Sequence, residues 1–349
     1  MSYPGLLIWY DQHKRALPFR GIRDPYGVWV SEIMLQQTRT ETVAGYYTRF
    51  LSLFPTVQAL AAAPEEAVLK AWEGLGYYSR ARNLHRAAQV IATAYGGIFP
   101  GDYEAIRALP GVGDYTAAAV ASIAFGLPYP AIDGNLTRVI SRVHGIREDV
   151  GIPSVKRKIE ALAREHIDRD RPGDWNQALM DIGATVCVPG TPECAACPLA
   201  EKCNARQEDD ADLLPVRAAA KPPVPVVVGV GLVTCGSRIL MQRREAALLR
   251  GLWVFFLVEG DSGREAMQKK LRSLGLDVAF KADLGEARHV FTHRVWNMRL
   301  YHFETSRPSP VRDFTWTDAQ ALGALPLPTA MKAAKKAAET ILNAAACIE

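Results

Sequence analysis

The chain has 349 residues, of which 49% are hydrophobic and 22% charged, and its formal net charge is +4. This length predicts roughly two domains, and the globular composition excludes a long disordered, collagen-like or coiled-coil chain. A nucleic-acid or membrane-surface role cannot be judged from so small a net charge and must be inferred from local patches and motifs. The N-terminus lacks the charge order of a signal peptide and no stretch reaches membrane-spanning length, so we expect a cytoplasmic protein with no membrane partner.

The first half of the chain, from residue 24 to about residue 206, is predicted to be all-α. Its alanine-rich stretches are broken by Gly and Pro and show almost no alternation of strand type. Asp24 and Pro25 are typical of a helix start, and this helix should run to about Gln37. Further helices are predicted over residues 41–53, 64–72, 79–95, 102–108, 115–125, 135–145, 154–168 and 173–184.

The composition changes at residues 207–225, an acidic and then proline-rich stretch that predicts an interdomain linker. Two β-rich runs around a Gly-Ser turn follow and predict a hairpin. The rest of this α+β domain, residues 226–349, is predicted to contain a helix near 263–275, strands near 287–305 and a final helix at about 329–345.

Four of the six cysteines crowd into residues 187–203, whereas Cys235 and Cys347 stand apart. The four are Cys187, Cys194, Cys197 and Cys203. In a reducing compartment, four thiolates in one loop favour a metal centre over disulfides. Zinc knuckles usually present two Cys-x2-Cys pairs and this loop has one, so the spacing favours a 4Fe–4S cluster over zinc or buried thiols. Such a cluster can be purely structural.

The segment Leu109-Pro-Gly111-Val112-Gly113 joins two predicted helices. Its glycines allow close backbone approach, and the N-terminus of the following helix offers free N–H groups that suit a DNA phosphate. A plain αα-hairpin is the alternative.

Two carboxylates, Glu32 and Asp133, are candidates for acid chemistry. Glu32 has mostly apolar neighbours on its predicted helix, which is expected to raise its pKa and retain a transferable proton. An exposed helix carboxylate is the alternative. Asp133 precedes a helical run, where N-capping bonds would hold it ionised beside a cation. Such a pair suits cleavage of a glycosidic bond through an oxocarbenium-like state.

Together, LPGVG-x-YTA, the IDGN turn and the cysteine spacing resemble the helix-hairpin-helix DNA glycosylases with an iron–sulfur cluster. Within that superfamily, SEIMLQQT, GLGYYSRARNL, NQALMDIGATVC, GLWVFF and HVFTHRVW look like the MutY-type adenine DNA glycosylases, over nearly the whole chain. The resemblance implies a helical catalytic core over residues 1–206, with a six-helix barrel at about 24–130 and a cluster lobe from 1–23 and 131–206, then a Nudix-like lesion-reading domain. It also implies a monomer that flips adenine out of duplex DNA, opposite 8-oxoguanine or guanine, and hydrolyses its N-glycosidic bond.

By this resemblance, Glu32 protonates adenine at N7, and Asp133 stabilises the sugar cation and the developing attack of water. Tyr115 stands where bifunctional relatives of the endonuclease III type place a Schiff-base lysine. A tyrosine cannot form that adduct, so we expect a monofunctional enzyme. Residues that match the duplex wedge or the lesion contact are Gln37, Thr38, Leu75, Tyr77, Phe291, Thr292 and His293.

Several positions depart from the family pattern. The segment RALPFR matches the adenine pocket with Arg15, Phe19 and Arg20, but the family more often has tryptophan at the position of Phe19. Relatives carry serine where this chain has Thr292, whose hydroxyl can still accept a hydrogen bond from N7–H of 8-oxoguanine. Residues 188–193 contain no Lys or Arg, although the family usually has basic residues there.

The C-terminal domain is predicted to read a base rather than hydrolyse a nucleotide, because residues 264–269 lack the glutamate pair that holds Mg²⁺ in Nudix hydrolases. Two alternative functions stay open at this point. One is an endonuclease III-like glycosylase for oxidised pyrimidines with AP lyase activity, and the other is a catalytically silent DNA-binding scaffold.

Overall fold

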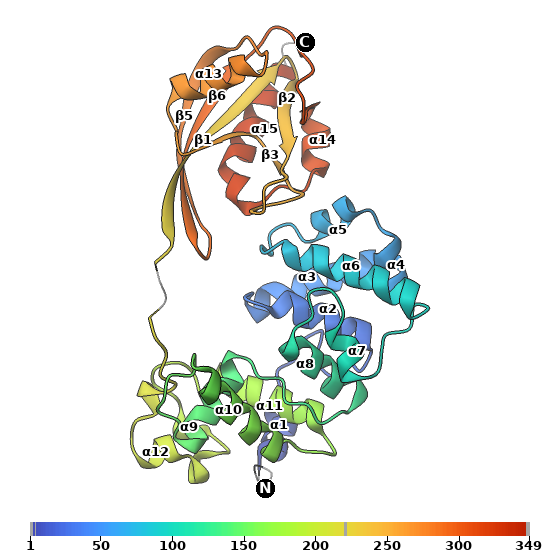
Figure 1. Ribbon diagram of the computed structural model, residues 1–349, viewed down its shortest axis with the longest axis vertical. Coiled ribbons are helices and arrows are strands. Elements are labelled where there is room, and N and C mark those ends of the chain that lie inside the picture. Colours follow the sequence, from blue (N-terminus) through green and yellow to red (C-terminus); the bar gives the residue numbers. More distant parts are fainter. Residues whose placement is uncertain (1–2, 4, 220–221, 347–349) are drawn as a thin grey trace. The chain divides into compact units, whose positions relative to one another are not determined.

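The computed structural model describes residues 3, 5–219 and 222–346 (Figure 1). Cys347 and linker residues 220 and 221 lie outside this range. The chain divides into two compact units, Met1–Ala62 with Asn83–Ala219, and Ala63–Arg82 with Ala220–Glu349. Contacts therefore group residues 63–82 with the C-terminal unit, although the predicted helical core includes them. No helix among the described residues is long and apolar enough to cross a membrane.

The first unit is helical, as the sequence predicts. Its helices are α1 (Leu6–His13), α2 (Pro25–Leu35), α3 (Thr40–Leu53), α4 (Val57–Ala62), most of α6 (Ser79–Ala94), α7 (Tyr103–Arg107), α8 (Asp114–Phe125), α9 (Gly134–His144), α10 (Pro153–His166), α11 (Pro172–Thr185) and α12 (Asn204–Gln207). Short 3₁₀ turns cover Cys194–Ala196, Ala200–Lys202 and Ala211–Leu213. The last of these turns lies inside the segment predicted as a linker.

Helix α2 is buried along almost its whole length, and its sequence is mostly apolar. Asp24 caps it by accepting a 2.7 Å hydrogen bond from the Gly27 N–H, and proline occupies its first position. Helix α8 packs against both α2 and α11. A Cβ on Gly173 of α11 would lie 2.8 Å from the backbone of Ile123, so a glycine there permits the close approach of α11 to α8.

A second core in this unit joins α1 to α9, α10 and α11. Leu6 and Tyr10 of α1 pack with Leu136, Ile140 and Trp175, which are all buried. The N-terminal helix therefore packs with elements that follow it by more than a hundred residues in the sequence, which places the segment after α1 beside α11.

The described residues of the second unit form a seven-stranded mixed sheet. Its strands are β1 (Val224–Cys235), β2 (Arg238–Arg243), β3 (Trp253–Val254), β4 (Phe256–Glu259), β5 (Ala279–Val290), β6 (Arg294–Glu304) and β7 (Phe314–Thr317), and its helices are α5 (Glu65–Ala71), α13 (Arg264–Ser273), α14 (Ala319–Ala324) and α15 (Lys332–Ala346). The order is β3-β2-β1-β6-β5, with β4 also on β1 and β7 on β2. Among the strand pairs that the structure describes, only β1–β6 is parallel.

Each face of this sheet is covered by a helix, because β1 is apolar on both faces. Val228 and Val230 share a core with α15, whereas Val233 shares one with α13. A Cβ on Gly229 would lie 2.5 Å from the sulfur of Met267, so α13 packs directly on glycine backbone. The predicted hairpin is confirmed by the antiparallel pairing of β1 with β2.

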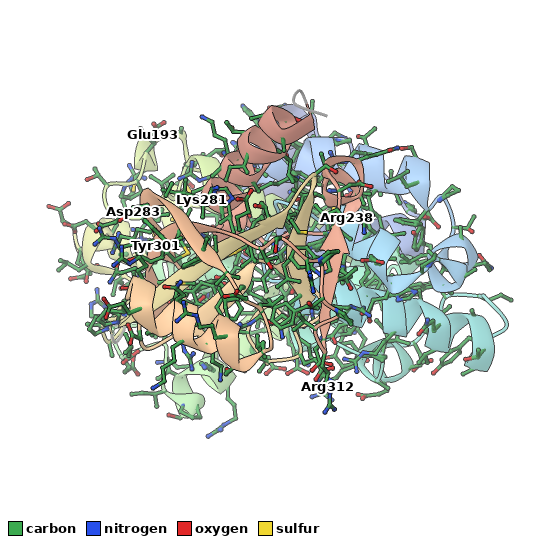
Figure 2. The ribbon with its side chains drawn as sticks, turned by 90° about the horizontal axis from the view of Figure 1, so that it is seen from above. Glu193, Arg238, Lys281, Asp283, Tyr301 and Arg312 are labelled. Atoms are coloured by element: carbon green, nitrogen blue, oxygen red, sulfur yellow. The ribbon has the colours of Figure 1, made fainter. Side chains whose placement is uncertain are left out.

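The edge strand β5 carries exposed charges, among them Lys281 and Asp283 (Figure 2). Such charges, together with the two register shifts in β5, disfavour pairing with another chain. Residues 264–269, which lack the glutamate pair of Nudix hydrolases, lie in helix α13. Gln268 on this helix donates a 3.0 Å hydrogen bond to the Val278 carbonyl oxygen.

Residues 63–82 attach to the C-terminal unit through hydrogen bonds to backbone carbonyls. The Lys70 ammonium donates to the carbonyl oxygens of Gly323 at 2.7 Å and Leu325 at 3.0 Å. The Tyr78 hydroxyl donates to that of Leu327 at 3.3 Å. This packing places the segment that contains Leu75 and Tyr77 in the same unit as residues 291–293.

Candidate active site

A cavity of about 690 Å³ in the helical unit gathers most of the predicted catalytic and pocket residues. Those that line it are Arg15, Phe19, Arg20, Glu32, Gln37, Thr38, Gly113, Tyr115 and Asp133. They come from the segment after α1, from α2 and its C-terminal end, and from the N-terminal ends of α8 and α9. Residues far apart in the sequence thus share one chamber.

Glu32 is only 3% exposed and lies on the buried helix α2. Burial raises the pKa of its carboxyl group, as the sequence predicts. The Tyr115 hydroxyl, on the first turn of α8, donates a 2.6 Å hydrogen bond to Oε2 of Glu32 and lowers that pKa in part. A buried carboxyl group whose pKa is raised can carry a proton to a bound base.

Asp133 is the N-cap of α9 and accepts hydrogen bonds from the Leu136 N–H at 2.7 Å and the Asn135 side chain at 2.9 Å. These bonds lower the pKa of Asp133, as expected for a capping residue. The net shift is nevertheless upward, because burial outweighs the bonds. Burial and the capping bonds therefore act on the pKa of Asp133 in opposite directions, and only the capping bonds can be recognised from the local sequence.

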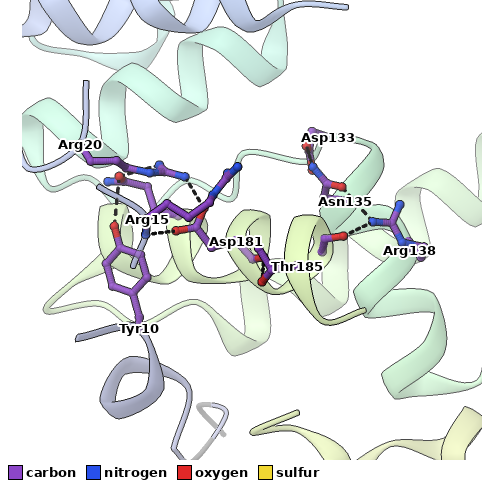
Figure 3. Close-up of polar contacts among 10 residues, drawn as sticks. Tyr10, Arg15, Arg20, Asp133, Asn135, Arg138, Asp181 and Thr185 are labelled. Carbon is purple, nitrogen blue, oxygen red and sulfur yellow. Dashed lines mark hydrogen bonds and ion pairs between the residues drawn. The ribbon is translucent and has the colours of Figure 1, made fainter. Parts of the chain in front are cut away.

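The loop around Asp133 is tied to the start of the cysteine-rich segment. The guanidinium of Arg138 donates a 2.9 Å hydrogen bond to the Asn135 side-chain oxygen and a 2.7 Å bond to the Cys187 carbonyl oxygen. Figure 3 shows Asp133, Asn135 and Arg138 in this sequence of contacts. The position of Asp133 therefore depends on α9 and on the chain that follows α11.

Asp181 organises the predicted adenine pocket, and sequence reasoning missed it. Its Oδ1 accepts hydrogen bonds from Arg15 Nε at 2.9 Å and from Arg20 at 2.7 Å (Figure 3). The neighbouring Gln177 accepts a 2.6 Å bond from Arg20. Both residues are buried on α11. Two polar residues four positions apart on an otherwise buried helix are the signal that could have indicated them.

Phe19 forms part of the apolar wall of this pocket. It is buried and meets Tyr47 edge-to-face, with 5.6 Å between ring centroids. Phe19, where the family more often has tryptophan, thus keeps an aromatic surface but lacks the indole N–H donor.

The glycine hairpin between α7 and α8 has the backbone that its sequence predicts. Gly111 has a φ of +75°, and a Cβ there would lie 2.4 Å from Cβ of Asn83. Val112 is buried. Gly113 is the N-cap of α8 and supplies no side-chain hydrogen bond to it. The first N–H groups of α8 therefore have no capping side chain from this residue, which suits an anion.

The four predicted cysteine ligands line one cavity together with Arg142, and none of them is in a disulfide. The Arg142 guanidinium donates to the Cys187 sulfur at 3.2 Å. Burial raises the pKa of Cys197 to about 11 and also raises that of Cys203. Among the described residues, no group of three or more His, Cys, Asp or Glu side chains is arranged to hold a single metal ion.

The remaining predicted contacts lie in the C-terminal unit. The hydroxyl groups of Tyr77 and Thr292 share a hydrogen bond of 2.8 Å. Tyr77 is 46% exposed and has a φ of +45°, whereas Leu75 is buried at 5%. Thr292 and His293 are exposed and Phe291 is half-buried. Tyr77, a residue predicted to enter the duplex, and Thr292, a residue predicted to contact the lesion, are therefore in direct contact although they lie 215 positions apart.

Comparison with known proteins places both units in families. The chain matches the HhH-GPD superfamily base excision DNA repair proteins over residues 30–168 and the NUDIX domain over residues 229–337. The adenine DNA glycosylase of Homo sapiens is 35% identical over 392 residues, covering 94% of this chain and 72% of the human protein. That of Mus musculus is 36% identical and covers 90% and 73%. The structure of a thermostable thymine-DNA glycosylase is 30% identical with a TM-score of 0.54, and covers 59% of this chain and 95% of the other.

Proposed function

Because the chain belongs to the adenine DNA glycosylases, N-glycosylases of base excision repair, we propose that its substrate is adenine paired with 8-oxoguanine or guanine in duplex DNA. We further propose that it acts as a monomer and without strand cleavage. The observation that best supports cleavage of the glycosidic bond is the buried Glu32. It accepts a hydrogen bond from Tyr115 in a cavity that Asp133 also lines.

In the proposed reaction, adenine enters the 690 Å³ cavity after it is flipped out of the duplex. The protonated Glu32 transfers its proton to N7 of adenine. The bond between C1′ of the sugar and N9 then breaks, and its electron pair goes to the base, which leaves as neutral adenine. Burial supports this role because it raises the pKa of Glu32 and so favours the protonated form that a general acid needs.

The sugar is left as an oxocarbenium ion, whose positive charge the ionised Asp133 stabilises. A water oxygen then bonds to C1′, and the proton that it loses restores the acid form of Glu32. The products are adenine and an abasic site. The hydrogen bonds to Asp133 from Leu136 and Asn135 support its ionised form against the opposing effect of burial.

Tyr115 supplies no amine, so no Schiff base to the sugar can form at this position. Its hydrogen bond to Glu32 supports a role in positioning the acid. This arrangement favours a monofunctional adenine glycosylase over an endonuclease III-like enzyme with AP lyase activity. The acid and the anion in one cavity also argue against a silent scaffold.

The loop with Phe291, Thr292 and His293 is proposed to read the base opposite adenine. The exposed Thr292 hydroxyl can accept a hydrogen bond from N7–H of 8-oxoguanine, which guanine lacks. Its contact with Tyr77 supports a joint site, in which the exposed Tyr77 enters the duplex beside the lesion. Leu75 is buried in this structure, so its proposed wedge role requires the loop to open.

Cys187, Cys194, Cys197 and Cys203 are proposed to hold a 4Fe–4S cluster, because all four line one cavity with their sulfurs free of disulfides. When bound, the cluster would cross-link the loop after α11. The Arg142 guanidinium, which lines the same cavity, donates a hydrogen bond to the Cys187 sulfur.

One experiment tests this function against its alternatives. Duplexes with adenine opposite 8-oxoguanine, guanine or thymine, or with an oxidised pyrimidine, are incubated with the enzyme and analysed with and without alkali. We expect adenine release from the first two, and strand cleavage only after alkali. Release of the oxidised pyrimidine, or a covalent adduct trapped in high yield by borohydride, would contradict the proposal.

A further inference from the structure

Residues 291–293 connect β5 to β6 in a tight turn with Thr292 and His293 at its tip. The Phe291 N–H donates a 2.8 Å hydrogen bond to the Arg294 carbonyl oxygen and closes the turn. The Val224 N–H donates a 3.0 Å hydrogen bond to the His293 carbonyl oxygen, and the Thr292 hydroxyl shares a 2.8 Å bond with that of Tyr77. The direction of the Thr292 side chain therefore depends on this bond with Tyr77 and on how the residues at the base of the turn are held.

Three aromatic rings gather at that base, and we call them the aromatic clamp: His289, Phe291 and Trp296. Phe291 packs edge-to-face on His289 at 4.5 Å and on Trp296 at 5.1 Å between ring centroids. His289 and Trp296 are direct partners across β5 and β6. Trp296 is fully buried, with the Arg244 guanidinium 5.6 Å from its ring centroid, so the core fixes one side of the clamp.

His289 forms the other side of the aromatic clamp. Its ring makes neither a hydrogen bond nor an ion pair with any residue that the structure describes, so packing is its contribution. Burial lowers the pKa of His289, which keeps the ring uncharged at neutral pH. An uncharged ring packed edge-to-face restricts its neighbour in the way that two phenyl rings do.

We propose that His289 is a positioning residue for lesion selection: by holding Phe291 against Trp296, it fixes the direction in which Thr292 meets the base opposite adenine. This inference rests on the lesion-reading role proposed above for residues 291–293. It adds a residue that touches neither base and takes no part in bond cleavage.

The test compares full-length His289→Ala, His289→Phe and wild-type enzymes in single-turnover reactions on adenine opposite 8-oxoguanine and opposite guanine. We expect His289→Ala to lower the ratio of the two rates about threefold to tenfold, the range for loss of one edge-to-face pair. His289→Phe restores a ring and should keep the wild-type ratio. Melting temperatures are measured in parallel, because a purely structural role would lower stability and leave the ratio unchanged.

Two further variants make the outcomes distinct. His302→Ala removes a half-buried histidine from β6, where His302 shares a 2.8 Å hydrogen bond with Thr234, and should lower stability without changing the ratio. Thr292→Ala removes the proposed lesion contact itself.

If Thr292→Ala lowers the ratio and His289→Ala does not, the positioning role of His289 is refuted and the lesion-reading proposal stands. If Thr292→Ala leaves the ratio unchanged, the lesion-reading proposal is refuted and the role of His289 with it.

Discussion

The Tyr115 hydroxyl donates a 2.6 Å hydrogen bond to Oε2 of Glu32, so α8 and α2 meet at the proposed acid. Burial raises the pKa of Glu32, and this bond lowers it because a donor favours the carboxylate over the neutral acid. The two effects oppose each other at one carboxyl group. Tyr115 therefore limits how far burial raises the pKa of Glu32.

The first prediction is that Tyr115→Phe moves the alkaline limb of the pH–rate profile to higher pH. Glu32 must be protonated to act, so the rate falls as pH rises through its pKa. Removing the phenol removes the group that lowers this pKa, and the limb shifts upward. Single-turnover rates on adenine opposite 8-oxoguanine, measured across the alkaline range, report the shift.

The control for this profile is Tyr26→Phe, which removes a phenol that donates to the Phe54 carbonyl oxygen. It should leave the limb in place. A limb that moves to lower pH in Tyr115→Phe would show that the phenol does not stabilise the carboxylate.

The second prediction concerns Glu32→Gln, which keeps the shape of the side chain and loses the transferable proton. We expect adenine release to slow by at least about a hundredfold, the lower range for loss of a general acid. Binding to the mispair should stay close to that of the wild type, because no DNA-facing charge is removed. Glu41→Gln, an exposed change on α3, is the matched control. Substantial excision by Glu32→Gln would exclude Glu32 as the acid.

Helix positions could be predicted because local signals mark them. Asp24 and Pro25 start α2, and the predicted α8 agrees with the structure to within about one residue. Helix α1 was missed because no side chain caps its N-terminus and it has few buried residues. Strand β5 begins earlier than predicted because its half-exposed edge lacks a clear apolar face.

The role of a site residue could be predicted where its sequence neighbours indicate it. It could not be predicted where the role depends on residues far away in the sequence. Glu32 could be chosen because its helix neighbours are apolar. Asp181 could not be assigned, since its role appears only when the segment with Arg15 and Arg20 folds back on α11. The Tyr77–Thr292 contact joins residues 215 positions apart, for which no local pattern exists.

The third prediction concerns the cysteine-lined cavity. Purified protein should be yellow-brown and hold about four irons per chain if the four thiolates bind one cubane cluster. Cys197→Ser should lower the iron content and destabilise the loop after α11, whereas Cys235→Ser, outside that cavity, should leave the iron unchanged. Metal analysis and visible absorbance measure both. Stoichiometric zinc without visible absorbance would contradict the cluster.

The last prediction concerns selection of the target. Adenine is a normal base, so correct A·T pairs survive only if the enzyme tests the opposite base. Thr292→Val keeps the shape and removes the hydroxyl. It should lower the preference for 8-oxoguanine over guanine by on the order of 1 kcal/mol, about fivefold in the rate ratio. Thr292→Ser keeps the hydroxyl and should retain the preference.

Tyr77 makes this prediction sharper, because its hydroxyl contacts that of Thr292 at 2.8 Å. If the bond orients Thr292 toward the lesion, Tyr77→Phe should lower the same ratio. The double variant Tyr77→Phe/Thr292→Val should then be no worse than Thr292→Val alone, since the hydroxyl to be oriented is already absent. Rate ratios for the four proteins form a double-mutant cycle. Strictly additive effects would mean that the two hydroxyls act independently, and that their hydrogen bond has no part in reading the opposite base.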